Sequence, residues 1–187
     1  PCTVRYPRPG GLGGGGATPE EYNRLTGAWT GTGCTTPPMC YSPVRPERHS
    51  EAVIRRTGEF VINLTTRSMA RATDWCGVRS GRDFDKFRET GLTPVPAERV
   101  AAPLIAEAPV SIECRVRQVL PLGTHDMFLA EVVNVQADEA YIDPATGRFC
   151  LERAEPIVYS HGEYFALGDA LGRFGWSVRR KRRKQGR

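Results

Sequence analysis

The stretch from Val110 to Asp138, "VSIECRVRQVLPLGTHDMFLAEVVNVQAD", decides the fold class. In its first half, apolar residues at 110, 112, 114 and 116 alternate with Ser, Glu and Arg, the period-two pattern of a strand with one exposed face. The second half, from residue 124, has the character of an antiparallel partner, and Leu122-Gly123-Thr124 between them is typical of a hairpin turn. Two long strands joined in this way predict a closed or partly closed antiparallel barrel with helices packed outside it.

The preceding residues add shorter elements to this barrel. Strands are predicted at residues 25–32 and 39–44, on either side of a Pro-Pro break, and at 59–64, which is rich in β-branched residues. Helices are predicted at 49–58, 66–77 and 83–91, each ending at a glycine, with Ser50 and Thr66 as the N-caps of the first two. The expected class is therefore β-rich α+β.

The chain divides into three parts by composition. Residues 1–21 hold four prolines and a long glycine cluster, so we expect a flexible arm that buries little apolar surface. Residues 22–178 form the expected single domain, and residues 179–187 form a tail.

The basic charge of the chain resides in that tail. The stretch "RRKRRKQGR" contains seven cations, and removing them from the net charge of +5 leaves −2 for the rest. We interpret the tail as a solvated terminus, because runs of like charge repel one another. The alternative is an electrostatic contact with nucleic acid, confined to this tail.

Several function classes lack support in the sequence. No apolar run approaches the roughly 18 residues of a membrane span, and residues 1–20 show no apolar signal region, so we expect a cytoplasmic protein. The six cysteines form no CxxC motif, and no Cys/His cluster has zinc-ligand spacing. We therefore expect reduced, mostly buried thiols and no metal site.

The stretch "NRLTGAWTGTGCTTPPM", residues 23–39, surrounds Trp29 with small and hydroxylated residues. A packed core prefers Leu, Ile and Val around a large side chain. This composition suits a surface that lies against a flat ligand with polar edges. Trp29 would then supply a rigid aromatic contact with one N–H donor.

Two further stretches could bind an anion. In "VRPERHS", residues 44–50, a strand leads into a helix start. The free N–H groups of that helix could bind an anion, and Arg45 or Arg48 could donate further, charge-assisted hydrogen bonds to it. The second stretch, "CGVRSGRDFDKF" at residues 76–87, is a cationic, glycine-bearing turn that could reach the same anion from the other side. Surface charge and an ordinary Ser cap explain the first stretch equally well. The second stretch is a weak signal on its own, because a Ser-Gly-Arg-Asp turn is common in proteins.

Among the three histidines, His125 is the better functional candidate because it is presented at the end of a long strand. No HExxH or GxSxG pattern is present. We assign no catalytic acid, base or nucleophile.

Six ordered blocks resemble the flavin reductase-like, flavoredoxin-type family. They cover about residues 22–178 and read "NRLTGAWTG", "VRPERHSEAVIRRTGEFVINL", "CGVRSGRDFDKFRETGLTPVPA", "APLIAEAPVSIECRV", "LGTHDMFLAEVV" and "PIVYSHGEYFALG". The resemblance implies an FMN-binding split barrel, an antiparallel Greek-key barrel with short flanking helices, and a homodimer with two FMN sites near the subunit interface. The glycine-rich arm stands where the family usually has an apolar first strand.

The resemblance also implies a set of FMN contacts. Trp29 and His125 would contact the flavin, Thr30, Gly31 and Thr32 would line the ring, and Tyr159 would cover its edge. The remaining positions are Asn23, and on the phosphate side Ser50, Lys86 and, more weakly, Arg48. This set matches the cofactor, since its phosphate needs cations or helix N–H groups and its ring needs flat or small neighbours.

The expected function is therefore an FMN-dependent oxidoreductase that passes electrons from NAD(P)H to a second flavin or a protein acceptor. GLGGGG, residues 11–16, lacks the strand and helix context of a nicotinamide fingerprint. A flavoredoxin-type electron carrier reduced by a partner protein is the close alternative. A nucleic-acid-binding module with an empty flavin site is the alternative from another class.

Overall fold

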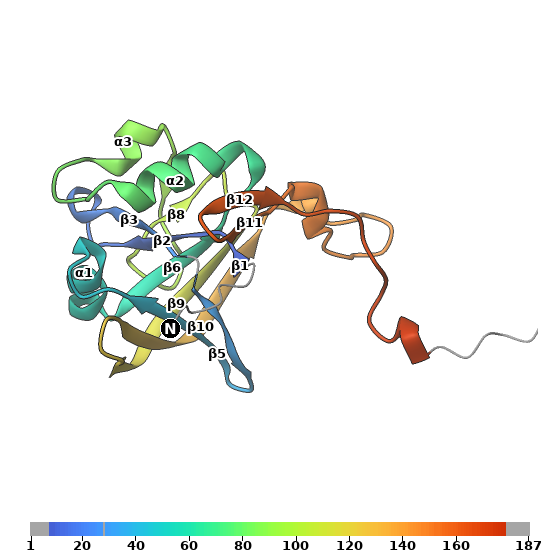
Figure 1. The fold of residues 1–187 in the computed structure, drawn as a ribbon, viewed down its shortest axis with the longest axis horizontal. Helices are drawn as coiled ribbons and strands as arrows, with labels where there is room; N and C mark the ends of the chain where they lie inside the picture. The colour runs from blue at the N-terminus through green and yellow to red at the C-terminus, as the bar shows by residue number, and fades with distance from the viewer. Residues whose placement is uncertain (1–7, 28, 179–187) are drawn as a thin grey trace, which may run out of the picture.

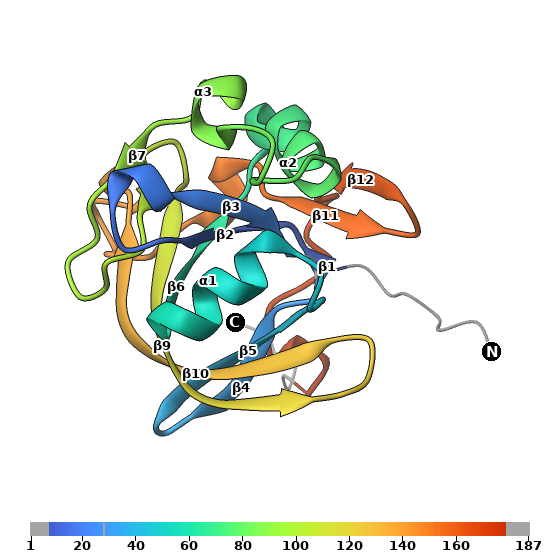
Figure 2. The ribbon, with the colours of Figure 1, turned by 90° about the vertical axis from the view of Figure 1, so that its left-hand side faces the viewer.

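The computed structural model describes residues 8–27 and 29–178. Its main element is a seven-stranded antiparallel sheet in the order β3-β2-β6-β9-β10-β5-β4, which curls into a barrel (Figures 1 and 2). In the described part of the chain the edge strands β3 and β4 do not pair with each other, so the barrel is split along one seam. The β-rich class and the antiparallel barrel predicted from the sequence are confirmed.

Two smaller sheets complete the strands, β1-β11-β12 and β7-β8. The strand bounds are β1 Arg8–Pro9, β2 Gly11–Gly15, β3 Asn23–Thr26, β4 Gly31–Thr35, β5 Pro38–Val44, β6 Glu59–Leu64, β7 Pro94–Val95, β8 Leu104–Ile105, β9 Val110–Pro121, β10 Asp126–Ala137, β11 Ile157–Ser160 and β12 Glu163–Ala166. The helices are α1 His49–Thr57, α2 Ala70–Val78 and α3 Lys86–Thr90, with short 3-10 turns η1 Pro19–Glu21, η2 Arg67–Met69, η3 Glu139–Tyr141, η4 Leu151–Ala154 and η5 Trp176–Val178.

The predicted hairpin is present with its turn at residues 122–125. Pro121 pairs with Asp126, and the ladder continues to Val110 opposite Ala137, with register shifts after Leu129 and after Val132. The turn glycine, Gly123, has a φ of 92°, a conformation that residues with a Cβ rarely adopt. The predicted strand at 25–32 is broken in the structure, because β3 ends at Thr26 and β4 begins at Gly31.

The flexible arm expected at residues 1–21 is wrong for residues 8–21. Gly11–Gly15 forms β2, an inner strand between β3 and β6, and its one large side chain, Leu12, is fully buried. The glycines allow neighbours to approach, since a Cβ on Gly14 would lie 2.6 Å from the Pro103 carbonyl oxygen. The segment is thus the first strand of the main sheet along the chain, and four of its five residues are glycine. Residues 1–7 and the predicted tail at 179–187 lie outside the described residues.

The barrel interior is filled by apolar side chains from strands and α1. Its buried members are Cys40, Val44, Ile54, Phe60, Ile62, Cys114, Phe128 and Ala130. A second cluster, with Leu12, Met69, Cys76 and Ile105, joins β2 to α2. The first cluster packs α1 and Leu25 of β3 against the barrel interior, and the second packs α2 against β2. As expected, most of the cysteines described are buried; Cys34 is exposed.

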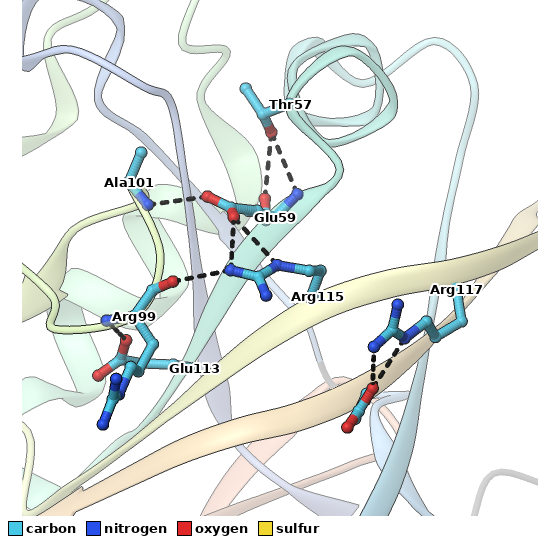
Figure 3. Close-up of polar contacts among 8 residues, drawn as sticks. Thr57, Glu59, Arg99, Ala101, Glu113, Arg115 and Arg117 are labelled. Carbon is cyan, nitrogen blue, oxygen red and sulfur yellow. Dashed lines mark hydrogen bonds and ion pairs between the residues drawn. The ribbon is translucent and has the colours of Figure 1, made fainter.

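Strand β9 departs from the predicted half-exposed pattern, because Ser111 and Glu113 are buried. The Glu113 carboxylate accepts hydrogen bonds from the backbone N–H groups of Arg99 (2.6 Å) and Glu98 (3.3 Å), and from the Asn134 and Gln136 amides. Figure 3 shows how Glu113, with the Glu59–Arg115 pair, attaches the loop at residues 98–101 to the sheet. A carboxylate with this many donors can be buried in the charged form.

The three predicted helices are present, with corrections at their ends. Arg48, and not Ser50, is the N-cap of α1, which ends at Gly58 as predicted. Thr66 caps the 3-10 turn before α2, and α2 continues past Gly77 to Val78. Helix α3 is capped by the Asp85 carboxylate, which accepts from the backbone N–H groups of Phe87 and Arg88. None of the helices described has the length and apolar character of a bilayer crossing.

Candidate functional site

Two cavities lie side by side above the barrel seam and share Leu25, Arg45 and Arg48 in their walls. The first, the aromatic cavity, has a volume of about 330 Å³ and opens between the β3–β4 connection, the start of β10, the end of α2 and the β11–β12 hairpin. Its lining is Leu25, Thr26, Gly27, Trp29, Pro43, Val44, Arg45, Arg48, Asp74, Gly77, Val78, His125, Tyr159, Gly162 and Tyr164.

Aromatic side chains form two walls of this cavity. The Trp29 and His125 rings are stacked, with centroids 4.8 Å apart and planes inclined by 27°. Tyr159 and Tyr164 form a tilted pair at 5.3 Å, brought together by the register of β11 with β12. The cavity therefore offers flat aromatic surfaces together with polar and charged side chains.

The polar edge contains an acidic group and two titratable rings. The Tyr164 hydroxyl donates to the Asp74 carboxylate at 3.3 Å, and burial followed by the Asp74 charge raises the pKa of Tyr164 to about 12. Burial, and then the positive charge of Arg45, lowers the pKa of His125 below its usual value. His125 is therefore mostly neutral at pH 7.

The second cavity, the cationic cavity, has a volume of about 230 Å³. It lies at the start of α1, where the loop after β5 meets the turn after α2. Its lining is Asn23, Leu25, Arg45, Glu47, Arg48, His49, Ser50, Arg79, Ser80, Gly81 and Lys86. The two stretches that the sequence suggested for an anion, at residues 44–50 and 76–87, thus meet around one cavity.

Positive charge exceeds negative charge around the cationic cavity. Four cationic side chains face one carboxylate, Glu47, which already pairs with Arg45 at 3.0 Å. Among the residues that the structure describes, Arg48, Arg79 and Lys86 form no ion pair. Arg48 donates instead to the Gly77 carbonyl at 3.1 Å, which ties the loop before α1 to α2.

Lys86 is the most deeply buried of these cations. Its Nζ donates to the carbonyl oxygens of Arg24 and Cys76, both at 2.7 Å, so one of its three N–H bonds remains for another acceptor. Burial is the main cause that lowers the pKa of Lys86 to about 8; Cys76 raises it, and Arg48 and Arg24 lower it further. A buried cation without a carboxylate is costly, and an anion in the cavity would offset that cost.

Asn23 and Ser50 complete the floor of the cationic cavity. The Asn23 amide donates to the Ser50 hydroxyl at 2.8 Å, and both side chains are buried. Gly81 packs directly against the Asn23 amide, which a Cβ at this position would overlap. This contact explains why the turn after α2 has a glycine here.

The structure brings most of the residues predicted for the site to these cavities. Trp29, His125 and Tyr159 line the aromatic cavity, Arg48 lines both, and Asn23, Ser50 and Lys86 line the cationic one. Thr30, Gly31 and Thr32 do not line either. The Thr30 hydroxyl lies 3.0 Å from that of Ser42, and Gly31 and Thr32 pair with β5, so the three residues contact β5 and not the cavities.

Some lining residues were not singled out from the sequence. Thr26 and Gly27 occupy the place expected for Thr30 and Gly31, because the chain turns away after β3. Arg79 lies within the predicted cationic turn at residues 76–87, but it was not among the residues predicted for the site. For Tyr164, the alternation in "YSHGEYF" was the one sequence feature that could have indicated its place, because the hairpin register sets Tyr164 opposite Tyr159. No sequence pattern indicated a place in the site for Asp74.

Known proteins are similar to this chain in sequence and in fold. The flavin reductase like domain family matches residues 4–168, and the chain belongs to this family. Its fold is the flavin reductase split barrel, as predicted. The family is one of flavin-related oxidoreductases and electron carriers.

Two individual proteins illustrate how similar this chain is to known sequences and structures. The structure of flavoredoxin of Desulfovibrio vulgaris (Miyazaki F) is similar, with a TM-score of 0.87 and 29% identity, over 96% of this chain and 97% of that chain. An uncharacterised protein of Aeropyrum pernix is 34% identical over 76% of this chain and 54% of its own length.

The reductase component of 4-nitrophenol 4-monooxygenase/4-nitrocatechol 2-monooxygenase from Rhodococcus opacus is 33% identical over 56% of this chain and 52% of its own length. This chain thus spans about half the length of the two curated relatives named here.

Proposed function

We propose that this protein binds FMN and acts as a flavin reductase-type oxidoreductase, passing electrons from NAD(P)H by way of FMN to a second flavin or a protein acceptor. The observation that carries the proposal is the convergence of Arg48, Arg79 and Lys86, none with a carboxylate partner among the described residues, beside an aromatic cavity. A phosphate at one end and a flat ring at the other match this pair of cavities.

The residues present fit that cofactor. At the phosphate end, the guanidinium groups of Arg48 and Arg79, the remaining Lys86 N–H and the Ser80 hydroxyl are donors for an anion. At the ring end, Trp29, His125 and Tyr159 supply flat contacts, and Leu25 and Val44 keep water away. The donors and acceptors of the ring edge can be met by Arg48 and by the Asp74 carboxylate.

When bound, FMN supplies the hydride and electron chemistry, which no side chain can perform. The chain's own residues bind and orient it and set the charge around it. A neutral His125 adds no positive charge at the ring beyond Arg45 and Arg48, which line both cavities, whereas Arg79 and Lys86 line only the cationic cavity. We assign no proton transfer to a side chain. The proposed quaternary state is a homodimer, and a cytoplasmic location remains a prediction.

A second candidate is a flavoredoxin-type electron carrier reduced by a partner protein. The similarity to flavoredoxin over nearly the whole of both chains favours this candidate, whereas the similarity to a named reductase component favours the enzyme. The absence of a nicotinamide fingerprint in the sequence fits a carrier as well as a reductase.

The visible spectrum of the purified protein, before and after addition of FMN, tests flavin binding. We expect two bands, near about 370 and 450 nm, of a bound oxidised flavin. Anaerobic mixing of the FMN-loaded protein with NADH and then NADPH separates the two candidates, since rapid bleaching is expected only of the reductase. A colourless protein that takes up no FMN, yet binds DNA with a steep salt dependence, would instead support the nucleic-acid-binding alternative.

A further inference from the structure

The segment after β12, residues 167–178, leaves the barrel and runs away from it (Figure 1). We call it the C-terminal arm. Within the described chain its backbone hydrogen bonds are internal, from Trp176 N–H to the Arg173 carbonyl and from Val178 N–H to the Gly175 carbonyl. The arm therefore has no ladder or cap that fixes it to its own barrel.

The C-terminal arm carries large apolar side chains in contact with solvent. Their exposed fractions are 92% for Leu171, 107% for Phe174, 61% for Trp176 and 82% for Val178. Isolated exposed apolar residues are common, but four within eight positions of a segment that ends in a turn and the 3-10 turn η5 are typical of a surface that a partner covers. Phe, Trp and Arg are also enriched where binding energy concentrates in interfaces.

A groove on the barrel has the complementary chemistry. It lies beside η1 and α3, has a volume of about 680 Å³, and is larger than either cavity of the proposed flavin site. We call it the acidic groove; it is lined by Pro19, Glu20, Glu21, Tyr22, Asn23, His49, Gly81, Arg82, Asp83, Phe84, Asp85, Phe87, Pro94 and Pro96. Its volume falls within the range of pockets that hold a ligand of several rings.

The groove combines an apolar floor with an acidic rim. Tyr22 and Phe87 lie with ring centroids 6.3 Å apart, and the prolines extend this surface. Four carboxylates face one guanidinium, that of Arg82, which gives the lining a formal charge of −3. Glu21 pairs with Arg56 at 2.9 Å and Asp85 caps α3, whereas Glu20 and Asp83 lie exposed on the rim.

The C-terminal arm has the matching order of residues. Phe174, Trp176 and Val178 are followed directly by six cations in a row, residues 179–184. An apolar segment that ends in cations complements an apolar floor with an acidic rim, both in shape and in charge. In Figure 1 the arm leaves on the side of the barrel opposite α3, so it points away from the groove of its own copy.

We propose that the C-terminal arm of one copy docks in the acidic groove of a second copy. Two such contacts, each arm in the other copy's groove, close a two-fold dimer and leave no unpaired arm. The contact assigns a role to the apolar arm and to the basic tail, neither of which the proposed flavin site uses. It does not rest on flavin binding, since no lining residue of the aromatic or cationic cavity belongs to the arm.

Site-specific photo-cross-linking of the full chain tests the contact. The variant Trp176→p-benzoylphenylalanine is mixed with ¹⁵N-labelled unmodified protein, allowed to exchange and irradiated, and the products are identified by mass spectrometry. We expect cross-links from the unlabelled arm to labelled peptides that contain residues 19–22 or 82–87. Val135, which is 55% exposed on β10, is the matched control position and should give no cross-link to those peptides.

Charge reversal tests the chemistry of the contact. Glu20→Lys with Asp83→Lys should lower the cross-link yield at least tenfold, and Arg180→Glu, Arg182→Glu and Arg183→Glu should do the same. Combining both sets should restore it. The control pair Glu139→Lys with Glu152→Lys, exposed and outside the groove, should leave the yield unchanged.

The salt dependence provides a second test. Because 0.5 M NaCl screens the attraction between exposed charges, it should reduce the cross-link yield. Cross-links confined to one copy, cross-links to other surfaces, or no cross-link at all would each overturn the proposal. Thermal melts confirm that each variant is folded, and FMN titration of the Glu20 and Asp83 variant reports separately on the proposed flavin site.

Discussion

The Asn23 amide donates to the Ser50 hydroxyl at 2.8 Å, and this buried hydrogen bond joins β3 to the first turn of α1. It forms the floor of the cationic cavity on one side, and Asn23 also lines the acidic groove on the other. A single buried amide thus separates the two and holds the start of α1 against the barrel. Both the shape of the cavity and the position of Arg48 depend on it.

Gly81→Ala should lower the free energy of unfolding by about 1–3 kcal/mol, since the new methyl group would displace the Asn23 amide. In an Asn23→Ala background the same change should cost much less, because the overlapping atoms are gone. Urea denaturation of the two single variants and the double variant measures this coupling. Additive effects of the two changes would contradict the contact.

Trp29→Leu should weaken FMN binding by about 1–3 kcal/mol, the range for an aromatic ring stacked on a base-like ring. The reason is its place in the wall of the aromatic cavity, where it stacks on His125. FMN titration followed by tryptophan fluorescence checks this prediction. Trp75→Leu is the control, because Trp75 packs on Phe84 outside both cavities; an equal loss of affinity in this variant would argue against a specific role of Trp29.

FMN affinity should fall by about tenfold between pH 7 and pH 9, because the phosphate binds the protonated form of Lys86 and its pKa in the free protein is about 8. Lys86→Met should bind FMN about 1.5–3 kcal/mol more weakly at pH 7 and should lose this pH dependence. Titrations at several pH values provide the measurement. A variant that keeps the same pH dependence would show that another group titrates.

The same pKa shift has a consequence for stability. The pKa of Lys86 is about 8 in the folded protein, below the ordinary lysine value of 10.5, so above pH 8 the unfolded chain binds more protons at this residue. The contribution of Lys86 to the free energy of unfolding should therefore rise with pH between about 8 and 10.5. Lys86→Met should remove that slope, which urea denaturation across this pH range can detect.

The parts of the fold and of the site that could be predicted from the sequence are those that depend on residues close together in the chain. The β9–β10 hairpin follows from period-two alternation and a turn glycine, both of which are local. The two stretches that we predict to bind an anion could be recognised because glycine, serine and cations cluster within a few residues. By contrast, Asp74 lies in α2 and Tyr164 in β12, and their side chains meet only in the folded protein. A local sequence pattern cannot predict a contact between residues so far apart in the chain.

The first strand was missed for a different physical reason. Five residues of "GLGGG" have almost no side chain to show a period, and glycine is typical of loops. Its place in the sheet is set by neighbours that approach the backbone of β2, among them Pro103 on Gly14. Burial of Glu113 was likewise hidden, because its four N–H donors come from the loop at residues 98–99 and from β10.

Glu113→Gln should lower the free energy of unfolding by about 1–3 kcal/mol at pH 7, since an amide cannot replace a carboxylate that accepts from four N–H groups. Burial raises the pKa of Glu113, but the hydrogen bonds from Gln136, Arg99, Asn134 and Glu98 outweigh it, so the pKa is lowered. The stabilisation is therefore present above the unfolded pKa and is lost as pH falls through the folded pKa. The difference between variant and parent should shrink in acid. Glu131→Gln, which removes the partly exposed partner of Arg117, is the control and should change stability by less than about 1 kcal/mol.

Gly14→Ala and Gly13→Ala form a matched pair that tests the role of β2. Both glycines lie in the same strand, but a Cβ on Gly14 would be 2.6 Å from the Pro103 carbonyl oxygen, whereas one on Gly13 would be 3.5 Å from that of Leu25. Overlap with backbone is not relieved by a rotamer change, so Gly14→Ala should cost about 1–3 kcal/mol of stability. Gly13→Ala should be neutral or slightly stabilising, because it reduces the freedom of the unfolded chain. Thermal and urea denaturation of the two variants measure the difference, and similar stabilities would mean that residues 11–15 are not packed as an inner strand of the barrel.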